Sequence, residues 1–137
     1  MNTIARGTVA ELMVSVELSK KEMTVCLPLN HNSEYDIVAD TENGLRKIQV
    51  KRAYSVDNHG TKVLCVETRR ILVKHSGKKG SVAGKYSDNG YDFLIACDVD
   101  NHNFWIIPRD KTAQYKAQIY LTKGMEQSLN QWILLGN

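Results

Sequence analysis

Hydrophobic and polar residues follow two different patterns along this chain of 137 residues. Near the start, apolar residues fall three or four positions apart, a spacing typical of one face of a helix, and this pattern ends near Lys20 or Lys21. Most later apolar residues occur in short alternating or continuous runs, which are typical of strands. A helix, several strands and a closing helix predict an α/β (α+β) fold in a single domain over residues 1–137.

The predicted first helix begins at Thr8, which is a favourable N-cap residue. Glu11 stands three positions later, where its side chain can complete a capping box with Thr8. The predicted buried face of this helix consists of Val9, Leu12, Met13 and Val16.

The later segments predict a mixed sheet of about five strands flanked by helices. Besides the two strands of a central hairpin, the predicted strands are residues 23–27, 62–68 as the next strand of a meander, 91–97, 104–108, and 117–122 at an edge. Residues 54–60 are predicted as a polar turn and residues 108–111 as a short helical turn. The closing helix is predicted over residues 127–135, and its packing residues are Leu129, Trp132, Ile133 and Leu135.

A tight hairpin is predicted where Asn43-Gly44 separates two β-prone runs, because this dipeptide tolerates the positive φ angles of a type I′ turn. With these two residues in the loop, Asp36 lies opposite Lys51, and Gln49 points to the same face as both. The opposite, buried face is predicted to carry Ile37, Ala39, Ile48 and Val50.

The polar face of this hairpin permits two interpretations. Asp36 and Lys51 form either a simple cross-strand ion pair beside a solvated Gln49, or part of a functional site. Glu11 strengthens the second interpretation if the first helix packs near the Asp36 end of the hairpin. The same side chain is also required by the capping box, so both roles of Glu11 stay open.

The formal net charge of the chain is +3, and one segment accounts for the positive excess. Residues 69–85 contain six basic residues and no acidic residue, whereas the rest of the chain has 12 basic and 15 acidic residues. Glycine and serine in this segment disfavour packed structure, so a basic flexible loop is predicted over residues 69–90. It is either an ordinary solvated loop or a phosphate-binding surface, and its basic residues are Arg69, Arg70, Lys74, Lys78, Lys79 and Lys85.

The cysteine and histidine residues indicate neither a disulfide nor a zinc site. Cys26, Cys65 and Cys97 lie in apolar segments without Cys-x-x-Cys spacing, so all three are predicted to be buried and reduced. His59 and His102 follow turn signals and are predicted to be solvated loop residues. No apolar run is long enough for a membrane helix and the first residues lack a secretory layout, so we expect a cytoplasmic protein without membrane contact.

Taken together, these motifs resemble the PD-(D/E)XK nuclease superfamily over most of the chain. The similarity is to its small branch with glutamine at the last acidic position, as in group I intron homing endonucleases of phages and bacteria. This resemblance implies a restriction-endonuclease-like core. The matching motifs are Gly7-Thr-x-x-Glu11, Tyr35-Asp36 and Gln49-Val-Lys51.

The resemblance implies a metal-dependent endonuclease that hydrolyses phosphodiester bonds in double-stranded DNA, with Mg²⁺, or Mn²⁺ in its place, as cofactor. It identifies Glu11, Asp36, Gln49 and Lys51 as catalytic, the first three as metal ligands and Lys51 as the lysine that orients water or neutralises charge on the phosphate. The basic loop is then predicted to contact DNA phosphates. Two departures from the family pattern are Tyr35, which replaces a proline, and Gln49, whose amide removes one negative charge from the metal site.

Two other functions stay open at this point. A structure-specific enzyme that resolves four-way Holliday junctions would use a similar fold and similar ligands. A catalytically weak DNA-binding module would retain the fold without turnover, and Gln49 favours that alternative. Because a single domain has one active site and a duplex has two strands, a homodimer or homotetramer is also predicted.

Overall fold

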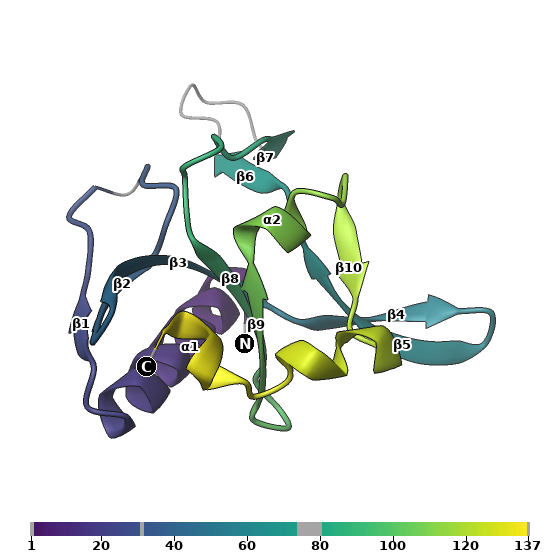
Figure 1. The fold of residues 1–137 in the computed structure, drawn as a ribbon. Coiled ribbons are helices and arrows are strands. Elements are labelled where there is room, and N and C mark those ends of the chain that lie inside the picture. Colours follow the sequence, from purple (N-terminus) through teal and green to yellow (C-terminus); the bar gives the residue numbers. More distant parts are fainter. Residues whose placement is uncertain (1, 31, 74–80, 137) are drawn as a thin grey trace.

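The computed structural model describes residues 2–30, 32–73 and 81–136, and a five-stranded mixed sheet lies at its centre (Figure 1). Its strands are β1 (Thr24–Cys26), β2 (Ile37–Thr41), β3 (Gly44–Arg52), β8 (Phe93–Asp98) and β9 (Asn103–Pro108), in the order β1-β2-β3-β8-β9. β3 and β8 are parallel, and the other neighbours are antiparallel. The predicted fold class and mixed sheet are confirmed.

A second sheet contains β4 (Tyr54–Asn58), β5 (Thr61–Glu67) and β10 (Gln118–Tyr120), in the antiparallel order β10-β5-β4. The predicted turn at residues 54–60 is therefore wrong, because pairing with β5 gives its polar backbone regular hydrogen-bond partners. The predicted meander is also wrong, since β3 pairs with β8 and leaves β5 to the second sheet.

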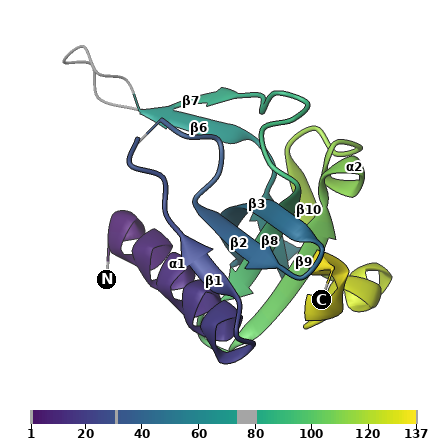
Figure 2. The same ribbon diagram turned by 60° about the vertical axis from the view of Figure 1, so that its left-hand side comes forward.

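The segment predicted as a flexible loop contains a two-stranded ribbon. β6 (Arg70–Val73) pairs antiparallel with β7 (Ser81–Gly84), so regular structure replaces the predicted loop at both strands. Residues 74–80 lie outside the described residues. In Figure 2 the ribbon lies above the β2–β3 hairpin and far from the end of the first helix that leads into β1.

Both faces of the central sheet are covered, which accounts for the nearly continuous apolar residues of β8 and β9. The helix α1 (Thr3–Lys20) and the short helix η2 (Trp132–Leu135) cover one face. The second sheet and the short helix η1 (Lys123–Ser128) cover the other face, and α2 (Arg109–Thr112) follows β9 directly. The fully buried residues include Val14, Leu18, Ile48 and Ile95 in the first layer, and Val66, Leu94, Ile107 and Ile119 in the second.

The first helix begins earlier and buries a different face than predicted. Asn2 is its N-cap, and the Asn2 side chain accepts a hydrogen bond from the Ala5 N–H at 2.8 Å. Thr8 therefore lies inside the helix, where its hydroxyl donates to the Ile4 carbonyl, and the capping box with Glu11 does not form. The buried stripe is Ala10, Val14 and Leu18, in which Ala10 allows close approach to the sheet, whereas Leu12 and Val16 are exposed.

The central hairpin has the predicted faces but a different register. Thr41 pairs with Gly44, so Glu42 and Asn43 form the loop, and Gly44 takes the positive φ of 117°. The Thr41 hydroxyl donates to the Gly44 carbonyl at 2.7 Å and favours this turn. A register shift of two residues preserves the face of every side chain, so Ile37, Ala39, Ile48 and Val50 are buried as predicted.

The C-terminal part differs from the predicted closing helix. It forms η1 and η2, separated by an extended stretch in which Leu129 bridges to Trp105. Trp132 and Leu135 are buried as predicted, but Ile133 is exposed because a 3₁₀ turn does not keep it on the same side. Cys65 and Cys97 are buried free cysteines, whereas Cys26 is exposed, contrary to prediction.

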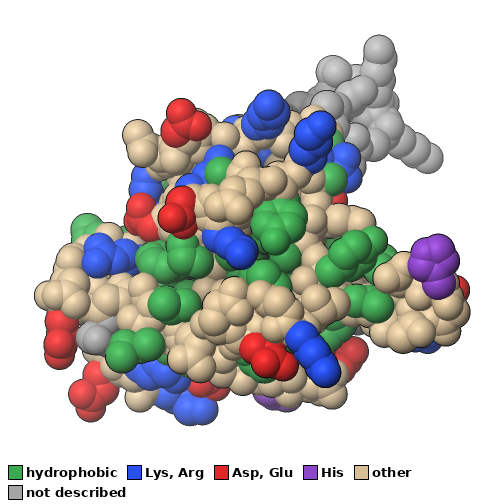
Figure 3. All heavy atoms as spheres, turned by 45° about the vertical axis from the view of Figure 1, so that its right-hand side comes forward, with side chains coloured by type: hydrophobic (Ala, Val, Ile, Leu, Met, Phe, Trp, Pro, Cys, Tyr) green, Lys and Arg blue, Asp and Glu red, His purple; other side chains and the backbone are tan. Residues whose placement is uncertain are grey.

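Apolar side chains reach the surface on more than one side. Ile4, Leu12 and Val16 are exposed on α1. Figure 3 shows a further face, where hydrophobic side chains gather near its centre. Among the described residues, no helix has the length and apolar character to cross a membrane.

Candidate active site

Asp36 lies immediately before β2, where that strand meets β3. Its N–H donates to the Ile48 carbonyl at 2.8 Å. Its Oδ2 accepts hydrogen bonds from the Val50 N–H and from Gln49 Nε2, both at 2.8 Å. Burial raises the pKa of Asp36, although the hydrogen bond from Val50 and the charge of Lys51 oppose this effect. The carboxylate is therefore held firmly in a partly desolvated position.

Gln49 faces Asp36 through the nitrogen of its amide. Gln49 Nε2 donates to Asp36 Oδ2 at 2.8 Å and to the Val50 carbonyl at 3.3 Å. Both partners accept hydrogen bonds only, so the amide nitrogen belongs on this side. Gln49 thus orients the carboxylate, an interaction that the sequence reasoning did not predict. The role of its carbonyl oxygen as a metal ligand stays a prediction.

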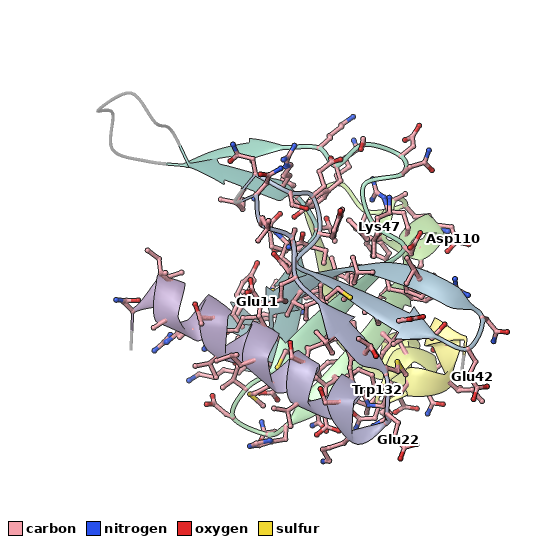
Figure 4. All side chains as sticks on the ribbon, turned by 90° about the vertical axis from the view of Figure 1, so that its left-hand side faces the viewer. Glu11, Glu22, Glu42, Lys47, Asp110 and Trp132 are labelled. Carbon is pink, nitrogen blue, oxygen red and sulfur yellow. The ribbon has the colours of Figure 1, made fainter. Side chains whose placement is uncertain are left out.

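Glu11 reaches Asp36 from α1, and Figure 4 shows it near the middle of the helix. The two carboxyl groups line a pocket of about 260 Å³, to which the loop before β2 contributes Ser33 and Tyr35. Burial is the main cause that raises the pKa of Glu11 from 4.5 to about 7, and the charge of Asp36 and a hydrogen bond with it act in the same direction. The two carboxyl groups are therefore electrostatically coupled neighbours in one pocket.

Lys51 follows Gln49 by two positions on β3 and points to the same face. Its Nζ donates to the Arg69 carbonyl at 3.0 Å and lies 5.4 Å from the centre of the Tyr86 ring. Burial lowers the pKa of Lys51, whereas the negative charges of Asp36 and Glu67 raise it. The predicted position directly opposite Asp36 is wrong, because the observed register continues to place Asp36 beside Gln49.

The oxygen donors of this site fit a hard divalent cation. Glu11 and Asp36 supply two carboxylates, and Gln49 supplies an amide. In the part of the chain that the structure describes, no group of three or more His, Cys, Asp or Glu side chains could hold a metal ion. Two neighbouring carboxylates nevertheless offer a place for a cation, whose charge would offset their mutual repulsion.

Three of the six predicted DNA-binding residues lie in the part of the chain that the structure describes. Arg69 forms an ion pair with Glu67, with Nε 2.7 Å from the carboxylate. Arg70 donates to the Asn32 carbonyl at 2.7 Å, and Lys85 is exposed beside the same segment. The remaining three predicted residues, Lys74, Lys78 and Lys79, lie outside the described residues.

Glu67 is a neighbour of the site that the sequence reasoning missed. It accepts hydrogen bonds from the Arg69 N–H at 2.9 Å and from the Arg69 guanidinium, and the carbonyl of Arg69 in turn accepts from Lys51. Local sequence contains no signal for this arrangement, because it joins the end of β5 to β3. Through Arg69, Glu67 therefore helps to position the Lys51 ammonium.

Comparisons with known proteins agree with this geometry. A family model described as PD-(D/E)XK endonuclease matches residues 1–132. Among solved structures, the bacterial homing endonuclease I-Ssp6803I is similar with a TM-score of 0.83 and 24% sequence identity, over 98% of this chain and 93% of that chain. The search of curated proteins finds no match.

Proposed function

The chain belongs to the PD-(D/E)XK endonuclease family, and from this premise we propose that it is a metal-dependent endonuclease that hydrolyses phosphodiester bonds in double-stranded DNA. One observation carries the proposal. The Glu11 and Asp36 carboxylates meet in one pocket, with Gln49 bonded to Asp36 and Lys51 on the same face of β3. The chain shares its fold with a bacterial homing endonuclease, and we therefore extend the proposal to a homing or mobile-element enzyme.

The proposed cofactor is Mg²⁺, with Mn²⁺ as a substitute, and Glu11, Asp36 and Gln49 would hold it. When bound, such an ion lowers the pKa of a water molecule and neutralises charge on a phosphate. The hydrogen bonds from Val50 and Gln49 keep Asp36 in one orientation. A ligand that is already oriented loses little conformational freedom when it binds.

Lys51 supplies the positive charge of the proposed reaction. The Arg69 carbonyl holds its Nζ in place, and the negative charges of Asp36 and Glu67 partly offset the lowering of the Lys51 pKa by burial. In this position Lys51 can stabilise the negative charge that develops on a phosphate under attack, or orient the attacking water. Both roles require the Lys51 ammonium to lie near the carboxylate pocket. Lys51 is on β3, two positions after Gln49 and on the same face.

We also propose that the active form is a homodimer or homotetramer, since one chain has one such site and a duplex has two strands. Exposed apolar side chains on α1 support an interface of this kind, because water contacts them in the single chain. Sedimentation at several protein concentrations tests it, and a monomer at all concentrations would contradict it.

The nuclease proposal is tested by incubating supercoiled and linear duplex DNA with Mg²⁺, with Mn²⁺ or with EDTA. We expect Asp36→Ala and Lys51→Ala each to slow cleavage by roughly 100-fold or more. Asp40→Ala is the matched control, because Asp40 is an exposed acid on β2, outside the pocket. Cleavage that survives both substitutions, or that ignores EDTA, would contradict the proposal.

One observation favours the alternative of a catalytically weak DNA-binding module. The Gln49 amide directs its nitrogen, not its oxygen, at Asp36. Gln49→Glu separates the two functions, because it adds a third carboxylate to the pocket. A duplex-cleaving activity that appears only in Gln49→Glu would favour the binding module, whereas cleavage by the unmodified protein would exclude it.

A further inference from the structure

A basic groove begins where the carboxylate pocket ends. It has a volume of about 750 Å³ and shares Ser33 and Tyr35 with the pocket of Glu11 and Asp36. Because two residues line both hollows, the basic groove and the carboxylate pocket are directly adjacent. The basic groove is polar and open, unlike the enclosed apolar pockets that small ligands prefer.

Three cationic side chains from three elements line the basic groove. They are Lys47 on β3, Arg70 on β6 and Lys85 directly after β7. Among the described residues that line it, Glu34 alone is acidic. The basic groove therefore has an excess of two positive charges beside a pocket lined by two carboxylates.

Lys47 is the cation of the groove that lies nearest along the chain to the candidate site. It precedes Gln49 by two positions, and alternation along β3 places both side chains on one face. Figure 4 labels Lys47. Its Nζ donates to the Asn89 carbonyl and lies 5.9 Å from the centre of the Tyr35 ring. Within the described residues Lys47 forms no salt bridge, so its charge is positioned but not neutralised.

The walls of the basic groove are joined by Glu34. Its carboxylate accepts hydrogen bonds from the N–H of Ser87, at 2.7 Å, and from the Ser87 hydroxyl, and it lies 3.8 Å from Arg70. Gly90 packs so closely that a Cβ there would lie 3.0 Å from this carboxyl group. These contacts connect the loop before β2 to the segment after β7, so the protein itself holds the groove in shape.

We propose that the basic groove binds the phosphate backbone of the DNA duplex next to the bond that is cut, with Lys47 as a direct phosphate contact and Arg70 and Lys85 beside it. This inference rests on the proposed nuclease function and deepens it by naming the track of the substrate. A row of phosphates matches an open groove with an excess of positive charge, and contacts of this kind position a duplex without reading its sequence.

The experiment measures binding of a labelled mixed-sequence duplex in EDTA, as a function of salt concentration. Lys47→Met keeps the apolar stem over Tyr35 and removes the charge. We expect it to lower the slope of log affinity against log salt by about 0.9, which is one phosphate contact, and to weaken binding several-fold at low salt. Glu34→Gln retains an acceptor for the Ser87 N–H but removes the negative charge, so it should tighten binding several-fold.

Lys20→Met is the matched control, because Lys20 is an exposed lysine at the end of α1, away from the β6–β7 ribbon. Its slope should equal that of the unmodified protein, and thermal unfolding checks that all three variants fold. If the unmodified protein cleaves and binds DNA but Lys47→Met keeps the full slope, the groove inference is wrong and the nuclease proposal stands. If the unmodified protein neither cleaves nor binds DNA, both are wrong.

Discussion

Glu11 reaches the candidate site from α1 and Glu67 from the end of β5, and the pKa values of their carboxyl groups are shifted in opposite directions. Glu11 lies beside the negative charge of Asp36, and its pKa is raised to about 7, first by burial and then by that charge. Burial acts on Glu67 in the same direction, but hydrogen bonds from the Arg69 side chain and N–H outweigh it and lower the pKa. Arg69 is the cation that pairs with Glu67, whereas we propose that Glu11 pairs with a metal ion from solution.

In the proposed mechanism this difference separates a metal ligand, Glu11, from a positioning residue, Glu67. Glu11 would gain a favourable partner only when a cation binds, so its charge costs stability in the metal-free protein. Glu67 is satisfied at all times, and through Arg69 it holds the group to which Lys51 donates. Substitutions at the two positions should therefore affect cleavage and stability in different ways.

Among substitutions that test this comparison of Glu11 with Glu67, the largest effect is expected for Glu11→Gln. It removes one of the two carboxylates available to a divalent cation, so the cleavage rate in Mg²⁺ should fall by roughly 100-fold, as for loss of a principal electrostatic contact. The measurement is single-turnover cleavage across a range of Mg²⁺ concentrations. A rate that recovers fully at high Mg²⁺ would show weakened metal binding alone, and an unchanged rate would contradict the role of Glu11 as a ligand.

The second prediction concerns the stability of the metal-free protein. Because the pKa of folded Glu11 is raised, its favourable contribution is fully present below pH 4.5 and is lost as the pH rises through about 7. The raised pKa of Asp36 acts with the same sign. In EDTA the free energy of unfolding should fall across this window, less steeply in Glu11→Gln. Urea unfolding at several pH values measures this, and equal slopes in both proteins would contradict it.

A smaller effect is expected for Glu67→Ala. Without its carboxylate, the Arg69 turn loses three hydrogen bonds and Lys51 loses its fixed partner, so kcat should fall roughly tenfold with little change in KM. Glu67→Gln retains an acceptor for the Arg69 N–H and should restore part of the rate. In a Lys51→Ala background the substitution should have no further effect. An equal loss in both backgrounds would show that Glu67 does not act through Lys51.

The smallest effect is expected for Glu17→Gln, which is a control for the loss of an ion pair. Glu17 lies on α1 and contacts Lys20 at 3.0 Å and Lys21 at 3.4 Å, outside the site. Surface pairs of this kind contribute little, so the free energy of unfolding should change by less than about 0.5 kcal/mol and cleavage should not change. A large effect of Glu17→Gln would mean that the change in net charge, and not the position of the carboxylate, explains the results for Glu11 and Glu67.

Errors in the predicted elements left much of the site intact. The hairpin register was wrong by two residues, yet Gln49 and Lys51 share the predicted face because side chains alternate with a period of two. The first helix buries Ala10 in place of Leu12, since close packing on the sheet selected a small residue over a large one. Glu11 reaches Asp36 because the observed stripe of Ala10, Val14 and Leu18 places it at the edge of the buried face, whereas the predicted stripe would have turned it away from the sheet.

Other features had no signal in local sequence. The pairing of β3 with β8, and the separate sheet that contains β5, depend on which strands bury their apolar faces together. The contact from Lys51 to Arg69 and the closure of the basic groove by Glu34 follow from that arrangement. Each joins residues that are distant along the chain, so no spacing rule predicts it.

Sequence by itself determined the types of side chain available for chemistry and, through the two-residue period of β3, which of them face together. Tertiary structure decided that Glu11 and Asp36 share a pocket, that Gln49 turns its nitrogen to Asp36, and that a basic groove continues from it. The physical reason is the distance along the chain over which each effect acts. Side-chain alternation follows from local backbone geometry, whereas burial and electrostatic interactions depend on every neighbour that the completed fold brings near.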